Sequence, residues 1–231
     1  MLAVSGKRQL EDKGRFDHSS SILLVMKKSQ LIHPYIERIL RQVILKDLAN
    51  KGRPHWDKPH TEAVVYWMKY LLKKINKPEL NSKVLITAAY AHDWGYANLF
   101  EQKKPITIDQ ALSQKDLHMK KGVEMIERLV YQRLSSYFTE AEILRLTHLI
   151  SIHDYVDQLQ DEDELLLMEC DALGMIDTER VNPTLSKEDS ERLMKNSINK
   201  KRLPQFMHQE AKSIAQDLIK KREKFYSTLK K

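Results

Sequence analysis

Apolar residues recur at helical spacing along most of this chain. Ile143, Leu146 and Ile150, for example, lie three and four residues apart. Such spacing places apolar side chains on one face of a helix, and no segment alternates with period two for long enough to need a sheet. The pattern predicts helices over residues 32–49, 59–75, 81–96, 115–135, 139–153, 161–177, 186–197 and 204–229. We therefore predict an all-α fold.

Other residues mark the helix ends and the loops. Asn81 and Thr139 are suitable N-caps, and Thr139 precedes Glu142 by the three residues of a capping box. Residues 97–114 have mixed charge, and we expect a long loop there. The expected organisation is a weakly structured segment at 1–30, a metal-binding helical domain at 31–180, and basic helices at 181–231 that pack on this domain or mediate dimerisation.

The net charge of +7 in a chain of 231 residues is unevenly distributed. Residues 1–177 hold 25 Lys or Arg and 25 Asp or Glu, whereas residues 178–231 hold 14 and 7. Residues 151–177 carry nine acids and no Lys or Arg. Acidic segments suit cations and basic segments suit phosphates. A solvated helix face explains the basic end more simply, so nucleic-acid binding stays open without being favoured.

Composition excludes several classes of protein. No run of 18 apolar residues occurs, and the N-terminus lacks the apolar region of a secretory signal, so we expect no membrane span and a cytoplasmic location. The 42% apolar content argues against disorder. Cys170 is the single cysteine and cannot form an internal disulfide.

Histidines and acids recur near the ends or apolar faces of the predicted helices. The set comprises His60, His92, Asp93, His118, His153 and Asp171. A buried ionisable group is costly unless it is paired or bound to a cation. Imidazole and carboxylate are both good ligands for divalent metals. For any one of these residues the alternative is a His–Asp hydrogen bond within the core, but their recurrence favours a metal site.

The order of these residues resembles that of the HD-domain superfamily of metal-dependent phosphohydrolases. Residues 86–95 (ITAAYAHDWG) are similar to the family's helix that ends in the His-Asp doublet. Residues 118–126 (HMKKGVEMI) resemble its histidine-containing helix, and residues 169–176 (ECDALGMI) resemble its terminal acid. The resemblance covers residues 55–180 and implies an HD-domain-like helical bundle.

The resemblance also implies the metal ligands and the activity. One divalent ion would be held by His60, His92, Asp93 and Asp171, and a second by His118 and His153 with Asp93 as the bridge. Mn, Fe, Co, Ni and Mg all suit such ligands. The implied reaction is hydrolysis of a phosphomonoester, phosphoanhydride or phosphodiester of a nucleotide-like small molecule by metal-activated water. His92 and Asp93 would lie at the catalytic centre.

The sequence departs from two branches of the family. Trp94-Gly95-Tyr96 follows the doublet and no Gly-Tyr-Pro occurs, which argues against a cyclic-di-GMP phosphodiesterase. No nucleotidyltransferase or synthetase module is recognisable. The cationic side chains that would contact the substrate phosphate are therefore unassigned. Lys103, Lys104 and Lys121 are candidates for substrate binding, and ordinary surface lysines are the alternative.

Two other functions stay open. Mixed-valent di-iron oxygenases of the HD fold present the same ligand order, and a non-enzymatic nucleotide sensor or scaffold could retain a metal site.

Among the remaining histidines, His148 precedes His153 by five residues, about 140° around a helix, so we expect it on a different face. His55 and His208 have no motif support, whereas Trp56 and Asp57 precede His60 and could shape the pocket mouth.

Overall fold

The computed structural model describes residues 30–100 and 106–228 of the chain. Every regular element in these residues is a helix or a helical turn, which confirms the predicted all-α fold. Leu31–Lys231 form one compact unit. The segment predicted to be weakly structured, 1–30, falls outside the described residues apart from residue 30, and so do Lys103 and Lys104.

The helices of the first half begin with a continuous helical segment that contains a π-helical stretch. This segment comprises α2 (Pro34–Leu40), η1 (Arg41–Leu45) and α3 (Lys46–Lys51). After it come the separate helices α4 (Asp57–Ile75) and α5 (Ser82–Ala91) and the 3₁₀ turn η2 (Trp94–Tyr96). After the undescribed residues come α6 (Ile108–Ser113) and α7 (Lys115–Leu129), which continues into the π-helical η3 (Val130–Leu134) and the short η4 (Ser135–Tyr137).

The second half carries α8 (Glu140–Ile152), the 3₁₀ turn η5 (Val156–Gln158) and α9 (Glu162–Ile176). The chain then forms α10 (Lys187–Leu193), which runs into the π-helical η6 (Met194–Arg202), the 3₁₀ turn η7 (Leu203–Gln205) and α11 (Gln209–Thr228). All eight predicted helices correspond to helical segments, although η7 and a break precede α11 where a single helix was expected.

The residues that begin two of the helices were identified correctly. The Asn81 side chain accepts a hydrogen bond from the backbone of Val84 at the start of α5. Thr139 and Glu142 form a reciprocal capping box at the start of α8. The predicted long loop at 97–114 is wrong in its second half, because Thr107 forms a second capping box that starts α6.

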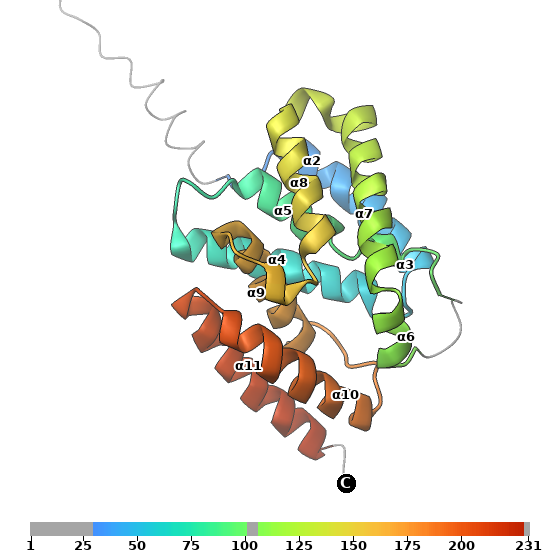
Figure 1. Ribbon diagram of the computed structural model, residues 1–231, viewed down its shortest axis with the longest axis vertical. Coiled ribbons are helices and arrows are strands. Elements are labelled where there is room, and N and C mark those ends of the chain that lie inside the picture. The colour runs from blue at the N-terminus through green and yellow to red at the C-terminus, as the bar shows by residue number, and fades with distance from the viewer. Residues whose placement is uncertain (1–29, 101–105, 229–231) are drawn as a thin grey trace, which may run out of the picture. The chain divides into compact units, whose positions relative to one another are not determined.

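The core lies between α4 and the helices that surround it. α4 packs against α5 and α9, α5 packs against α8, and α8 packs against α7 (Figure 1). Fully buried apolar side chains such as Met68, Leu71, Ile86 and Leu146 fill the space between these helices. The five helices that meet here are the ones that carry the histidine and acid set.

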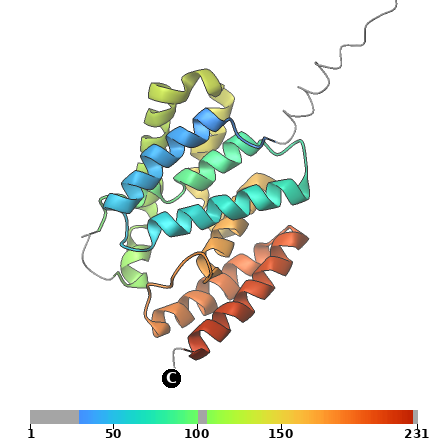
Figure 2. The same cartoon turned by 180° about the vertical axis from the view of Figure 1, so that it is seen from behind.

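The last helices pack on this core. α11 contacts α9 and α4, and the view from behind shows it beside the α10 segment (Figure 2). His208, just before α11, lies between the carboxylates of Glu169 and Glu162 on α9, at 2.7 and 3.1 Å. In α11 the Arg222 guanidinium donates to the Ser190 hydroxyl of α10. Within the described part of the chain, no helix combines the length and apolar character needed to cross a bilayer.

Candidate metal centre

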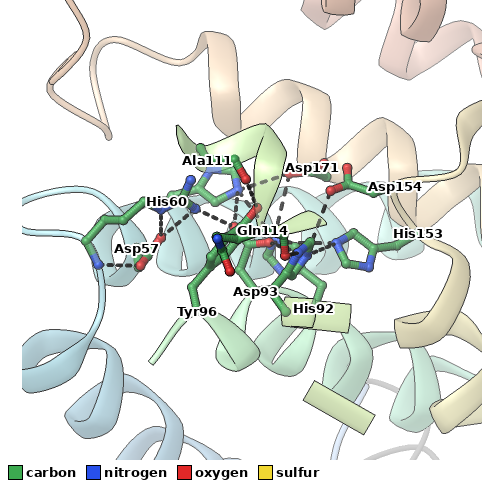
Figure 3. A network of polar contacts seen from close by, with 12 residues as sticks. Asp57, His60, His92, Asp93, Tyr96, Ala111, Gln114, His153, Asp154 and Asp171 are labelled. Atoms are coloured by element: carbon green, nitrogen blue, oxygen red, sulfur yellow. Dashed lines mark hydrogen bonds and ion pairs between the residues drawn. The ribbon is translucent and has the colours of Figure 1, made fainter. Parts of the chain in front are cut away.

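Five helices bring the predicted histidines and acids together. His60 lies in the first turn of α4, and His118 in the first turn of α7. His92 and His153 are the residues at which α5 and α8 end. Asp93 follows His92, and Asp171 lies within α9. All six residues are buried, between 0% and 6% exposed. Figure 3 shows His92 and Asp93 between His60 and His153.

Gly95 permits the close approach that places His118 beside Asp93. A Cβ at Gly95 would lie 1.8 Å from the carbonyl oxygen of His118 and 2.7 Å from the backbone nitrogen of Gly122. Both contacts are to the backbone of α7, so a side chain here cannot be accommodated by rotation. The glycine therefore sets the distance between η2 and α7.

We expect Gly95→Ala to destabilise the protein by about 1–3 kcal/mol, because the methyl group must push α7 away. The displacement would also move His118, so metal retention should fall. Denaturant unfolding and metal analysis measure the two effects. Gly122→Ala is the control, since the nearest atom to its Cβ would be in the Ile150 side chain at 3.1 Å, and backbone atoms would lie only at 3.6 Å or more. Equal behaviour of the two variants would contradict this role for Gly95.

The buried donors form two groups that share Asp93. The first comprises His60, His92 and Asp93, and the second Asp93, His118 and His153. Asp93 Oδ2 lies 3.8 Å from His60 Nε2 and 3.7 Å from His92 Nε2. Its other oxygen, Oδ1, lies 3.6 Å from His118 Nε2 and 3.7 Å from His153 Nε2. Each carboxylate oxygen therefore faces one pair of imidazoles, and either group could hold a metal ion.

The backbone orients three of the four imidazoles. Nδ1 of His92 lies 3.0 Å from the Ala89 carbonyl oxygen, and Nδ1 of His153 lies 2.9 Å from that of Ile150. Nδ1 of His118 is 3.3 Å from the Gln114 carbonyl. Because a carbonyl only accepts, each Nδ1 carries the hydrogen and donates it. Nε2 is then left with a lone pair toward Asp93, as in histidines that ligate metals.

The close approach of these Nε2 atoms requires a hydrogen or a cation between them. His60 Nε2 is 3.3 Å from His92 Nε2, and His118 Nε2 is 3.4 Å from His153 Nε2. Two facing lone pairs repel unless a proton or a cation lies between them. Ligands about 2 Å from one ion are themselves roughly 3–3.5 Å apart. The donor set and its spacing therefore fit divalent metal ions.

Without a metal, the two imidazoles of each pair differ in their pKa values, so one binds a proton more readily than the other. Burial lowers the pKa of His92, and it lowers the pKa of His118 to about 4. Burial also opposes protonation of His60, but the hydrogen bond to Asp171 outweighs it and raises that pKa. The pKa of His153 rises to about 9 because its interaction with Asp93 outweighs burial. Each pair thus contains one readily protonated imidazole.

Metal binding should therefore release protons. A metal ion needs the lone pair that His153 shares with a proton up to about pH 9. We expect about one proton released per ion bound by the second group at neutral pH, with apparent affinity rising roughly tenfold per pH unit between pH 6 and 8. A pH indicator in weakly buffered solution measures the release during Mn²⁺ titration. Metal binding without proton release would contradict the assignment of His153.

Asp171 faces the first pair of histidines. Its Oδ1 lies 3.0 Å from His60 Nε2 and 3.7 Å from His92 Nε2. Its Oδ2 accepts a hydrogen bond from Arg202 Nη2 at 3.1 Å, and the same nitrogen donates to Asp154 Oδ1 at 2.7 Å. The other oxygen of Asp154 lies 3.8 Å from His118 Nε2. Arg202 thus joins a carboxylate beside the first group to one beside the second.

A second arginine holds Asp93 itself. Arg53 Nη2 lies 3.1 Å from Asp93 Oδ2 and 2.6 Å from Asp57 Oδ1. The guanidinium lies over the Tyr96 ring, 4.0 Å from its centroid, and that ring stacks on His118 at 4.0 Å. Asp57 is fully buried and forms an ion pair with this arginine, so it does not form the pocket mouth that the sequence suggested.

A cavity of about 830 Å³ opens onto the centre. His60 and Asp93 line it, together with Arg53, Trp56 and Asp154. Trp56 lines the cavity, as its position in the sequence suggested, and its ring stacks on that of His60. Lys121 does not line the cavity, and Lys103 and Lys104 lie outside the described residues. His148 bonds to Glu164 at 2.7 Å and belongs to neither group, in agreement with its expected face.

Sequence reasoning missed four residues of this neighbourhood, namely Arg53, Asp154, Arg202 and the cavity-lining His55. Asp154 directly follows His153, which was the one local signal available. The arginines lie 40 and 31 residues from the acids they bind, Asp93 and Asp171.

In comparisons with known proteins, no family model, curated protein or solved structure matches the chain. The chemical conclusion of this geometry is a buried His/Asp centre that could hold metal ions.

Proposed function

We propose that this protein is a metal-dependent phosphohydrolase that cleaves a phosphomonoester, phosphoanhydride or phosphodiester of a nucleotide-like small molecule. The carrying observation is the pair of histidine groups that share Asp93 at the wall of an open cavity. The order of the ligands along the sequence, which resembles the HD-domain superfamily, supports the same activity. The wider cavity wall also carries cations suited to an anionic substrate.

The residues divide into holding and orienting roles. His60, His92 and Asp171 would hold one ion and His118 and His153 another, with Asp93 between them. A bound divalent ion supplies Lewis-acid activation of water and neutralises charge that develops on the phosphate. Arg53 and Arg202 hold the carboxylates in place. Trp56 offers an aromatic surface inside the cavity, against which a base or another planar group could stack.

Phosphate release by protein loaded with Mn²⁺ or Co²⁺, assayed without oxygen, tests the proposal. We expect turnover of a nucleotide or of p-nitrophenyl phosphate, and its loss in His92→Ala. The control is His148→Ala, because that imidazole is bonded to Glu164 outside both groups. Turnover that needs iron and oxygen would instead support a di-iron oxygenase. Metal and nucleotide binding without turnover under any condition would support a sensor.

A further inference from the structure

One continuous helical face forms a wall of the cavity. Arg192 and Leu193 of α10 line it, and so do Asn196, Ser197, Lys201 and Arg202 of η6. These positions recur at spacings of four and five residues, which places them on the same side of the helix. The cavity is also lined by α6 and by the start of α7, where Lys115 is the first residue. The wall is mostly polar and carries three cationic side chains.

The cations around the cavity differ in whether a protein carboxylate already binds them. Arg53 binds Asp57 and Asp93, and Arg202 binds Asp154 and Asp171. Arg192 binds Asp109 and Asp189. Lys115 and Lys201 form no ion pair with any acid in the described part of the chain. Their charges are available to a ligand.

Lys115 is nevertheless held in a defined position. Its ammonium group lies 4.5 Å from the centroid of the Tyr155 ring, which is also part of the cavity wall. The Tyr155 hydroxyl donates to Asp116 at 2.8 Å, which fixes the ring. A cation over an aromatic face keeps its charge and can still accept an anionic partner.

Arg202 supplies an independent observation. The residue is 4% exposed, and its Nε is buried without a hydrogen-bond partner. Buried donors are almost always paired, so an unpaired one on a cavity wall indicates a partner that binds there. Arg222 also has an unpaired Nε, but that residue does not line the cavity. Arg202 is adjacent to Lys201 in the chain and contacts Asp171, so it connects this wall of the cavity to the metal centre.

We propose that Lys115, Lys201 and Arg202 form a second anion subsite, which binds a phosphate group other than the one at the metal centre. The substrate therefore carries at least two phosphate groups, as a nucleoside diphosphate does. This inference rests on the proposed function for the position of the first phosphate. A phosphate bears up to two negative charges and several acceptor oxygens, which match two ammonium groups and a guanidinium better than a carboxylate does.

Calorimetric titration with methylenediphosphonate and methylphosphonate, at a fixed free Mn²⁺ concentration, tests the subsite. The first probe resembles two linked phosphates but cannot be hydrolysed, and the second resembles one. The test variant is Lys115→Gln/Lys201→Gln. The matched control is Lys120→Gln/Lys200→Gln, which removes the same charge from neighbouring lysines that do not line the cavity.

We expect wild type to bind the diphosphonate at least about tenfold more tightly than the monophosphonate. The test variant should lose about tenfold in diphosphonate affinity and change less than about twofold for the monophosphonate, with the control close to wild type. No preference in wild type, or an equal loss in the control, would overturn the subsite. No preference in wild type together with intact monoester hydrolysis refutes the subsite alone. An intact preference without any hydrolysis refutes the proposed function alone.

Discussion

Replacement of Asp93 by Asn should abolish metal retention at both histidine groups. The carboxylate is the one acid shared by the two groups, and each of its oxygens faces two imidazole nitrogens at 3.6–3.8 Å. The amide keeps the side-chain volume but removes the negative charge, so the cations would face imidazoles and Arg53 without their shared counter-charge. Metal analysis of protein purified without added metal, beside wild type, measures this effect. Any metal-dependent rise in melting temperature should disappear with it.

Asp177→Asn is the matched control for Asp93→Asn. Asp177 is 1% exposed and accepts hydrogen bonds from Trp67 and Arg180, but it belongs to neither metal group. Its variant should lose stability and keep the wild-type metal content. Full metal retention in Asp93→Asn would refute the shared-ligand assignment. Equal metal loss in both variants would show that any buried acid has this effect, and would refute it too.

The helical fold could be predicted because its pattern is local. Apolar spacing within a helix and the capping residues Asn81 and Thr139 act over a few positions, and the structure reproduces them. The same rule explains the error at 97–114. Thr107 and Gln110 have capping-box spacing, but the mixed charge favoured a loop over the whole range. Local signals compete there, and a helix as short as α6 gives little periodicity to decide between them.

The centre was predictable only where the sequence carries a motif. The six ligand candidates were identified from their order, and the structure brings all six into contact with one another or with Asp93. The arginines that hold the acids were not identifiable, because nothing in the local sequence separates Arg202 from the neighbouring Lys200 and Lys201. Burial distinguishes it, and burial depends on how η6 packs beside α9.

His208 illustrates the same limit. It has no motif, yet its imidazole lies between two carboxylates of α9, and Glu169 also accepts from the backbone of residues 207 and 208. Burial opposes its protonation, but the bond to Glu169 outweighs this and raises its pKa. The histidine therefore attaches α11 to the helix that carries Asp171. The basic C-terminal segment is thus connected to α9 twice, through His208 and through Arg202.

We expect Arg202→Met to destabilise the metal-free protein by about 3–5 kcal/mol at pH 7, because it leaves the buried Asp171 and the partly buried Asp154 without their cation. Arg202 is the ion-pair partner that Asp154 and Asp171 share. Chemical denaturation at several pH values measures the effect. Arg222→Met is the matched control, since Arg222 is equally buried at 4% but donates to neutral groups, the Met175 carbonyl and the Ser190 hydroxyl. Its loss should be smaller, about 1–3 kcal/mol.

The pH dependence separates charge from packing in this pair of variants. Burial raises the pKa of Asp154 and Asp171, but His153 and Arg202 outweigh it for Asp154, and His60 and Arg202 for Asp171, so both pKa values are lowered. A lowered carboxylate pKa stabilises above the unfolded value of about 3.9, and this stability is lost as the pH falls through the folded pKa. The difference between wild type and Arg202→Met should therefore shrink below about pH 4, whereas the Arg222→Met difference should not. Mn²⁺ should also reduce the loss of stability in Arg202→Met, because the ion neutralises the negative charge of Asp171. A loss that is independent of both pH and metal would show that Arg202 acts through packing alone.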